Sequence, residues 1–185
     1  MSRPFIPEHP QRPFRVASDQ QNEAQRALVE SILAGPRKDL PINMEIWLNN
    51  PQFAKVANAF AEYVGHTAPM SRRIKEIVIL VVAAHLKSSF EWFWHERLAR
   101  QLKIEEVQIA AIQAEQPAVF DDPEEQVSHD LAVAFLRDRD VPAALHERAM
   151  QVLGHSGVAD ITGLIGLYVM VALALDFYRV PVPEI

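Results

Sequence analysis

The sequence predicts an all-α protein, and two observations lead to this prediction. Every long proline-free stretch after Pro13 places apolar residues three or four positions apart, which is the spacing of one helix face. No stretch shows the strict apolar–polar alternation typical of a half-buried strand, and no internal repeat is present. A chain of 185 residues is long enough for one domain with its own core. We therefore expect a bundle of seven or eight helices joined by short connections.

Capping residues and prolines mark where the expected helices begin. These helices cover residues 18–33, 51–64, 72–86, 89–101, 104–114, 123–137, 142–154 and 158–178. The residues expected to cap them are Ser18 or Asp19, Asn50, Ser71 and Asp122.

The N-terminal stretch differs from the rest of the chain. Pro4, Pro7, Pro10 and Pro13 recur every third residue, which favours an extended arm over a helix. We therefore divide the chain into a proline-rich arm, residues 1–17, and a single helical domain, residues 18–185.

The last expected helix is apolar on nearly all sides. Its segment Ile161–Leu175 is shorter than the roughly 18–20 residues that cross a membrane, and Asp160 and Asp176 bracket it. We interpret it as a core or subunit-interface helix. Gly163 and Gly166 would let another backbone approach closely, so we expect an oligomer.

Composition excludes several classes of function. The formal net charge is −6 and no basic run exceeds two residues, so we expect no nucleic-acid partner. The N-terminus lacks the apolar run of an export signal, and we expect a cytoplasmic protein without a membrane span. The sequence contains no cysteine, which removes disulfides, thiolate metal ligands and thiol catalysis.

The stretch from Glu76 to His95 contains the candidate site. Ser88, Glu91 and His95 are spaced so that one helix face carries all three. Glu76 lies on the preceding helix, and a fold-back of the two helices would bring its carboxylate to the same place. A carboxylate beside a histidine fixes the ring tautomer and raises its basicity, as in a general acid or base.

A simpler interpretation is an ordinary ion pair on the protein surface. Glu91 and His95 lie one helical turn apart, and such a pair stabilises a helix by a few tenths of a kcal/mol. The aromatic residues around them argue against a fully solvated face, because so dense a cluster must pack. These residues are Phe90, Trp92, Phe93 and Trp94.

The segments Ser71–Ile77 and Ser88–His95 resemble the carboxymuconolactone decarboxylase family, which also contains the alkylhydroperoxidase-D-like proteins. The first glutamate, the gap, the glutamate–tryptophan step and the histidine recur in the family's order. Residues 48–51, 101–107 and 163–168 resemble further family motifs more weakly, and the resemblance covers about residues 43–180. It implies an alkylhydroperoxidase-D-like helical bundle that forms trimers or hexamers, with sites near subunit contacts.

The peroxidase branch of this family carries a Cys-x-x-Cys pair before the histidine. Ser88 and Glu91 occupy those two positions here. A serine cannot form the disulfide of a peroxide cycle, and a carboxylate cannot resolve a sulfenic acid. Thiol peroxidase chemistry is therefore excluded.

The decarboxylase branch resembles this chain more closely. It implies a cofactor-independent lyase that decarboxylates a carboxylated unsaturated lactone or a related small carboxylic acid. His95 would then handle the proton, and Glu76 or Glu91 would orient and charge the ring. We expect neither a metal nor a cofactor.

Substrate contacts are expected for four further residues. Ser88 would donate a hydrogen bond to a substrate oxygen, and Arg72 or Arg73 would hold a carboxylate. Trp92 would line an apolar pocket.

Two alternatives stay open. A metal-dependent enzyme would use ligands from Glu76, Glu91, His95 and His85, although no HExxH signature is present. A non-enzymatic oligomer would bury the aromatic cluster as core or interface. A cleft that holds Glu91 and His95, with a histidine pKa away from about 6.5, would favour an enzyme.

Overall fold

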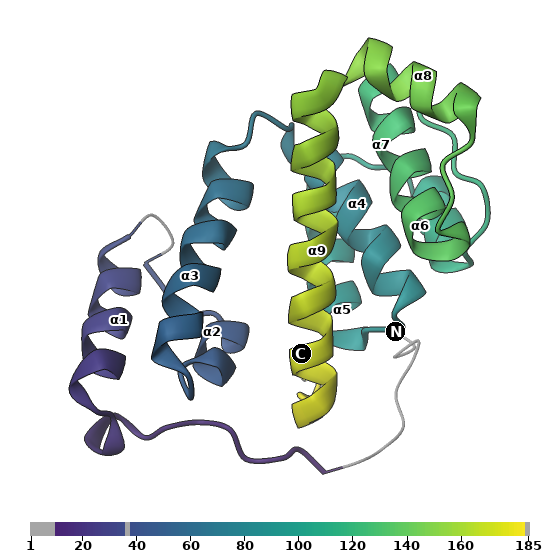
Figure 1. Cartoon of the computed structure of the whole chain (residues 1–185). Helices are drawn as coiled ribbons and strands as arrows, with labels where there is room; N and C mark the ends of the chain where they lie inside the picture. Colours follow the sequence, from purple (N-terminus) through teal and green to yellow (C-terminus); the bar gives the residue numbers. More distant parts are fainter. Residues whose placement is uncertain (1–9, 36–37, 184–185) are drawn as a thin grey trace.

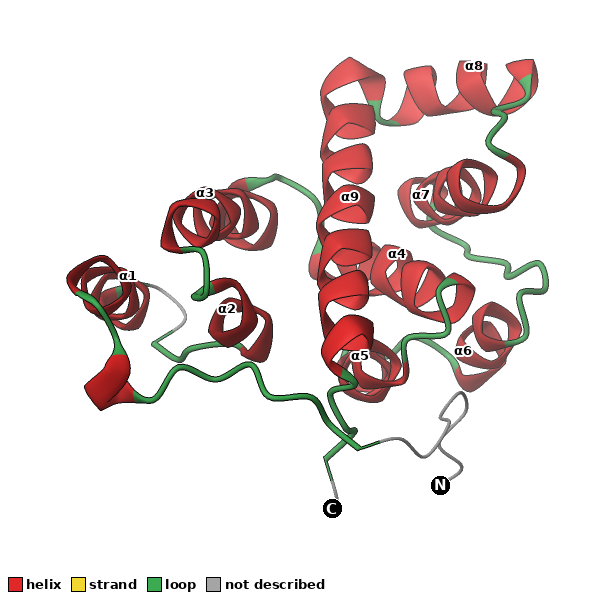
Figure 2. Cartoon of the chain, turned by 60° about the horizontal axis from the view of Figure 1, so that its bottom comes forward, coloured by secondary structure: helices red, strands yellow, loops and turns green. Residues whose placement is uncertain are grey.

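All regular structure in the computed structural model is helical across the residues that it describes, 10–35 and 38–183 (Figures 1 and 2). The nine α-helices in this part of the chain are α1 (Glu23–Ala34), α2 (Ile42–Trp47), α3 (Pro51–Glu62), α4 (Arg72–His85), α5 (Ser89–Gln101), α6 (Glu106–Gln113), α7 (Pro123–Val133), α8 (Ala143–Val152) and α9 (Gly154–Tyr178). A 3-10 turn, Ser18–Gln20, precedes α1, and the π-helical turns η2 (Tyr63–Thr67) and η3 (Ala134–Asp138) extend α3 and α7. The all-α prediction is confirmed; the six-residue α2 is the helix that the sequence patterns missed.

Side-chain caps begin three helices as predicted. Asn50 accepts from the backbone N–H of the third residue of α3, and Ser71 does the same for α4. Asp122 accepts from two N–H groups at the start of α7. The predicted cap of α1 is wrong: Asn22 and Gln25 form a reciprocal capping box there, so α1 begins four residues or more after the predicted caps.

α4 ends in a tight turn that no glycine in the sequence marks. α4 ends in a Schellman motif, in which Ser88 N–H donates to Ala83 O at 2.9 Å and Lys87 N–H donates to Ala84 O at 3.2 Å. Lys87 has a φ of 54°, in the left-handed region that glycine usually occupies. Because the chain reverses within this motif, α5 packs back against α4.

α4 lies at the centre of the fold. It packs against α5, α6, α7 and α9, and residues 77–84 are all buried. A helix with neighbours on so many sides is apolar all round over its buried part. Its first turns, which carry Arg72, Arg73, Lys75 and Glu76, contain its charged side chains apart from His85 at the other end.

α9 runs along the molecule between α3 on one side and α4 and α5 on the other (Figure 1). Of the helices described, it alone has the length and composition to cross a membrane, with a mean hydropathy of 2.1 and 44% of its most apolar window buried. A core helix of a soluble protein meets the same criteria. Gly163 faces the ring of Phe60, which an added Cβ would meet at 3.5 Å. At Gly163 a side chain of the same chain therefore uses the space that we expected another backbone to use, whereas nothing described lies within 4 Å of the Cβ position of Gly166.

The described part of the arm, residues 10–17, lies in extended conformation against the end of α9. Arg12 N–H donates to Tyr178 O at 2.9 Å, and the buried Phe14 ring lies 5.5 Å from the Tyr178 ring. Asn49 Nδ2 donates to Phe14 O at 2.8 Å. Residues 1–9, including Pro4 and Pro7, lie outside the described residues.

We expect Val78→Ala to lower the free energy of unfolding by about 2 kcal/mol, because this α4 side chain is fully buried and its loss leaves a cavity. The matched control is Val107→Ala on α6, where the valine is 69% exposed and the change should stay within about 0.5 kcal/mol. Urea unfolding followed by circular dichroism measures both. An equal decrease in the free energy of unfolding for the two variants would contradict the central position of α4.

Candidate active site

The fold-back of α4 and α5 brings together two residues that are 19 positions apart. His95 Nδ1 lies 2.6 Å from Glu76 Oε2, across the contact between the two helices. His95 Nε2 lies 3.4 Å from Oε2 of Glu91, one helical turn earlier on α5. All three side chains are nearly buried, with 8–12% of each exposed. The histidine ring therefore has a carboxylate at each nitrogen.

The two carboxylates hold the ring in its charged form. Burial alone would lower the pKa of His95, but the hydrogen bonds to Glu76 and then Glu91, together with their charges, raise it from 6.5 to about 9. The imidazole consequently carries a proton on both nitrogens at neutral pH. Such a buried cation with two acidic partners can store a proton and give it up to a bound molecule.

Glu76 and His95 open onto a cleft of about 1000 Å³. The cleft lies between the first turns of α4, the middle of α9, and the segment that connects α3 to α4. Residues 64–70, which include most of η2, form one wall. π-helical turns are rare and are frequent at functional sites.

Tyr168 of α9 also lines the cleft and contacts the histidine. Its ring meets the His95 ring edge-on, with centroids 5.1 Å apart and planes at 87°. This contact limits how the imidazole can turn. Tyr168 was not among the predicted site residues, although it is a polar side chain in the middle of the apolar run of the last helix.

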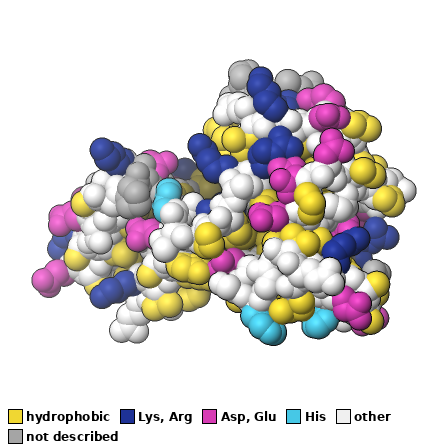
Figure 3. All heavy atoms as spheres, turned by 90° about the horizontal axis from the view of Figure 1, so that it is seen from above, with side chains coloured by type: hydrophobic (Ala, Val, Ile, Leu, Met, Phe, Trp, Pro, Cys, Tyr) yellow, Lys and Arg dark blue, Asp and Glu magenta, His cyan; other side chains and the backbone are white. Residues whose placement is uncertain are grey.

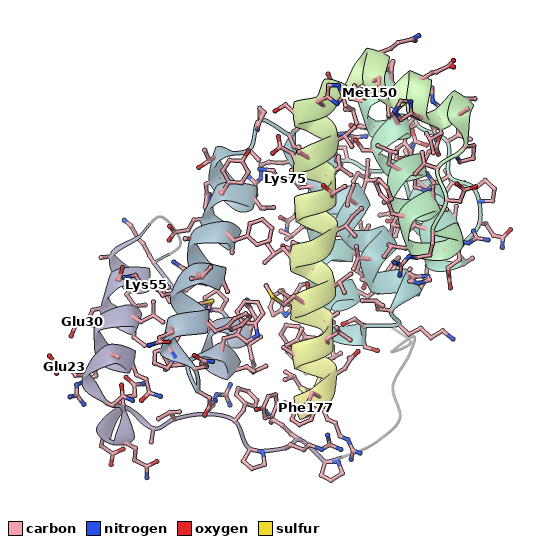
Figure 4. All side chains as sticks on the ribbon, in the orientation of Figure 1. Glu23, Glu30, Lys55, Lys75, Met150 and Phe177 are labelled. Carbon is pink, nitrogen blue, oxygen red and sulfur yellow. The ribbon has the colours of Figure 1, made fainter. Side chains whose placement is uncertain are left out.

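Two cationic side chains from the start of α4 line the same cleft, Arg72 and Lys75. Lys75 Nζ donates to Gly65 O at 3.0 Å and to Ala68 O at 3.4 Å, which ties the connecting segment to α4 (Figure 4). Burial lowers the pKa of Lys75, while the charge of Asp160 acts in the opposite direction. Lys75 was not among the predicted site residues, although its position one helical turn from Arg72 indicated that the two could face the same side.

The other predicted substrate contacts lie elsewhere. Arg73 forms a two-point ion pair with Glu125 of α7, at 2.5 and 2.9 Å, and a further bond to the backbone of residue 102. Ser88 is 1% exposed and its Oγ has no hydrogen-bond partner within the described residues. Trp92 is also 1% exposed, in the core. None of these three lines the cleft, so the geometry gives no support to their predicted contact with substrate.

The predicted metal alternative also finds little support in the side-chain geometry. Within residues 10–35 and 38–183, no three histidine, aspartate or glutamate side chains are arranged to hold a metal ion. His85, one of the four candidate ligands, lies 3.5 Å from Glu115 and lines a different cavity.

Comparisons with known proteins bear on the fold. No family model and no curated protein matches the sequence. A peroxidase-related protein with an alkylhydroperoxidase AhpD core from Ralstonia eutropha JMP134 is similar in structure, with a TM-score of 0.72 and 11% identity over 95% of this chain and 94% of that chain. A peroxidase-related protein from Silicibacter sp. TM1040 has a TM-score of 0.71 and 16% identity over 94% and 92%. A debrominase in complex with 2,3,4-tribromopyrrole has a TM-score of 0.70 and 9% identity over 92% and 91%.

These similarities extend over nearly the whole chain, but the identities are low enough that they carry the fold alone. The fold that the sequence resemblance implied is therefore confirmed. The chain has the AhpD-like, carboxymuconolactone decarboxylase-type helical fold.

Proposed function

We propose that this protein is a cofactor-independent lyase that decarboxylates a small unsaturated carboxylic acid, such as a carboxylated lactone. The observation that supports the proposal is the position of His95, which is held between Glu76 and Glu91 at the wall of a cleft. A non-enzymatic oligomer would need no such group. The burial of His95 between two carboxylates therefore supports an enzyme over the non-enzymatic alternative.

The proposed reaction needs one proton and no redox partner. The bond from the substrate's α carbon to its carboxylate breaks, carbon dioxide leaves, and the electron pair delocalises into the conjugated carbonyl. His95 then donates a proton to carbon and is reprotonated from solvent through its carboxylate partners. The Nε2–H lies 3.4 Å from Glu91 and is bound less tightly than the Nδ1–H, whereas Nδ1 faces Glu76, the carboxylate of the two that lines the cleft.

The cations of the cleft fit an acidic substrate. Arg72 and Lys75 place positive charge near the His95–Glu76 pair, where they attract a carboxylate and stabilise a developing enolate oxygen. Arg72 is the one of the two predicted arginines that reaches this cleft. Its guanidinium can hold a planar carboxylate by two hydrogen bonds.

The proteins of similar structure suggest reactions other than decarboxylation, since one of them is a debrominase. The peroxidase-related relatives in turn point to peroxide chemistry. The thiol form of that reaction has no nucleophile here, because Ser88 and Glu91 stand where the peroxidase branch carries cysteines. Proton transfer by His95 is the chemistry that the side chains of this cleft can perform without a further group.

We also propose that the active form is a homo-oligomer, a trimer or a hexamer. α3 and the first residue of η2 expose one apolar face, consisting of Phe53, Val56, Phe60 and Tyr63, with exposed fractions of 37–70%. Near the end of α9, Leu173 and Phe177 are 59% and 62% exposed. Seen from above, hydrophobic side chains lie among charges of both signs (Figure 3). Apolar surface of this kind is typical of a face that another subunit covers.

We expect His95→Asn to lower kcat for 4-carboxymuconolactone at least about 100-fold, because asparagine cannot deliver the proton. Release of carbon dioxide by metal-free protein is the measurement. His155→Asn, at an exposed position at the start of α9, is the matched control and should keep full activity. No turnover by folded wild-type protein would exclude this substrate, and an active His95→Asn variant would exclude the role of His95.

We expect Glu76→Gln to lower the pKa of His95 from about 9, because one of the two carboxylates that oppose burial is lost. The raised pKa also means that the stabilisation from this histidine is complete below about pH 6.5 and is lost as the pH rises through about 9. Histidine ring shifts in NMR titrations measure the pKa. Glu124→Gln, an exposed change on α7, should leave it unchanged. An equal His95 pKa in the wild type, Glu76→Gln and Glu124→Gln would contradict the contact between His95 and Glu76.

We expect Val56→Asp to reduce the oligomer to smaller species, because it places a charge in the apolar face of α3. Light scattering after gel filtration gives the mass. Val107→Asp is the matched control, since Val107 is 69% exposed and Val56 is 70% exposed. A monomeric wild type, or an unchanged mass for Val56→Asp, would contradict the proposed interface.

A further inference from the structure

A second cavity, separate from the cleft, lies between α4, α6, α7, η3 and α8 and has a volume of about 290 Å³. It shares no lining residue with the cleft of His95. Its walls are mainly apolar, formed by Val81, Ile112, Val133, Leu136 and Leu145. A mostly apolar cavity with a few well-placed polar groups is the usual form of a small-molecule site.

One buried polar side chain faces this cavity, His129 of α7. It is 4% exposed, and its Nδ1 lies 3.0 Å from Asp130 Oδ1. Burial would raise the pKa of Asp130, but hydrogen bonds from His129 and Gln126 outweigh it and lower the pKa, so the carboxylate stays ionised. An ionised acceptor fixes the proton of His129 on Nδ1. Nε2 is then the ring nitrogen left for a ligand, and no hydrogen bond joins it to a described residue.

The charged groups near the cavity do not require a charged ligand. Asp130 is already paired with His129, Gln126 and Arg148. His85 and Glu115 are 31% and 38% exposed, which places them at the opening rather than in the interior. The interior therefore offers one unpaired acceptor among apolar side chains, and a neutral ligand with a single donor matches it.

Two features of the chain contribute to the wall of this cavity. The π-helical turn η3 widens the end of α7 and contributes Ala134 and Leu136 to the wall. Arg137 NH1 donates to Glu115 O at 3.1 Å, which ties η3 to the loop after α6. An apolar cavity of about 150 Å³ is enough to hold benzene. A volume of about 290 Å³ therefore accommodates one aromatic ring with short substituents.

We propose that this cavity is a binding site for a small phenol, with the ring among the apolar side chains and the hydroxyl donating to His129 Nε2. Because His129 Nε2 can pair with a hydroxyl, we expect the site to bind a phenol more tightly than the corresponding hydrocarbon. A hydrocarbon of the same shape would fill the same space, exclude water from Nε2 and leave this nitrogen without a partner. The site is independent of the proposed decarboxylation.

The test compares two probes by titration calorimetry, 4-ethylphenol and ethylbenzene. We expect 4-ethylphenol to bind about tenfold or more tightly, since an unmet buried acceptor costs about 1–3 kcal/mol. Ala134→Leu should abolish binding of both probes by filling the cavity. Ala110→Leu, at an exposed position on α6, is the matched control and should bind like wild type.

The hydroxyl contact has its own readout, which needs no variant of His129. On addition of 4-ethylphenol, the nitrogen-15 resonance of His129 Nε2 in the wild-type protein should shift as it accepts a hydrogen bond, and ethylbenzene should leave it in place. Failure of 4-ethylphenol to bind, equal affinity for the two probes, or unchanged binding by Ala134→Leu would each overturn the proposal.

Discussion

The hydrogen bond between His95 and Glu76 is the interaction on which the site depends, because it joins two helices that the chain brings together only through a tight reversal. The reversal is the Schellman motif at the end of α4, with Lys87 in the left-handed region. Without that turn, a residue on α5 could not reach one 19 positions earlier. The pair in turn keeps a charged ring inside the fold, since Glu76 and Glu91 together compensate for the loss of solvent.

The position of α4 explains why the charged groups of the cleft come from its first turns. From residue 77 to residue 84 the helix is buried on every side and has room only for apolar side chains. Its start is not enclosed in this way, so Arg72, Lys75 and Glu76 can face the cleft while Arg73 faces α7. One helix therefore supplies both the centre of the core and the polar edge of the cleft.

Sequence patterns predicted features that depend on neighbouring residues, such as helix starts. They did not predict which side chains face the cleft, because that depends on how each helix is rotated about its axis. Caps such as Asn50 and Ser71 act within one turn, so most helix starts could be predicted. The pairing of Glu76 with His95 followed from the motif resemblance and the expected fold-back. Which of two adjacent arginines reaches the cleft depends on a rotation of about 100° around the helix axis, which only packing determines. Tyr168 was not chosen as a site residue, because its contact with His95 depends on how α9 packs against α5.

The functions that we propose for His95 and His129 differ because of the groups at their second nitrogen. Each ring has Nδ1 against a carboxylate, at 2.6 Å from Glu76 and at 3.0 Å from Asp130 respectively. His95 has a second carboxylate, Glu91, at Nε2, and the added charge keeps the ring protonated, as a proton donor requires. His129 has an apolar cavity in that place, so its Nε2 can serve as an acceptor. The same side chain beside the same kind of partner is thus suited to proton transfer in one cavity and to recognition of a hydroxyl in the other.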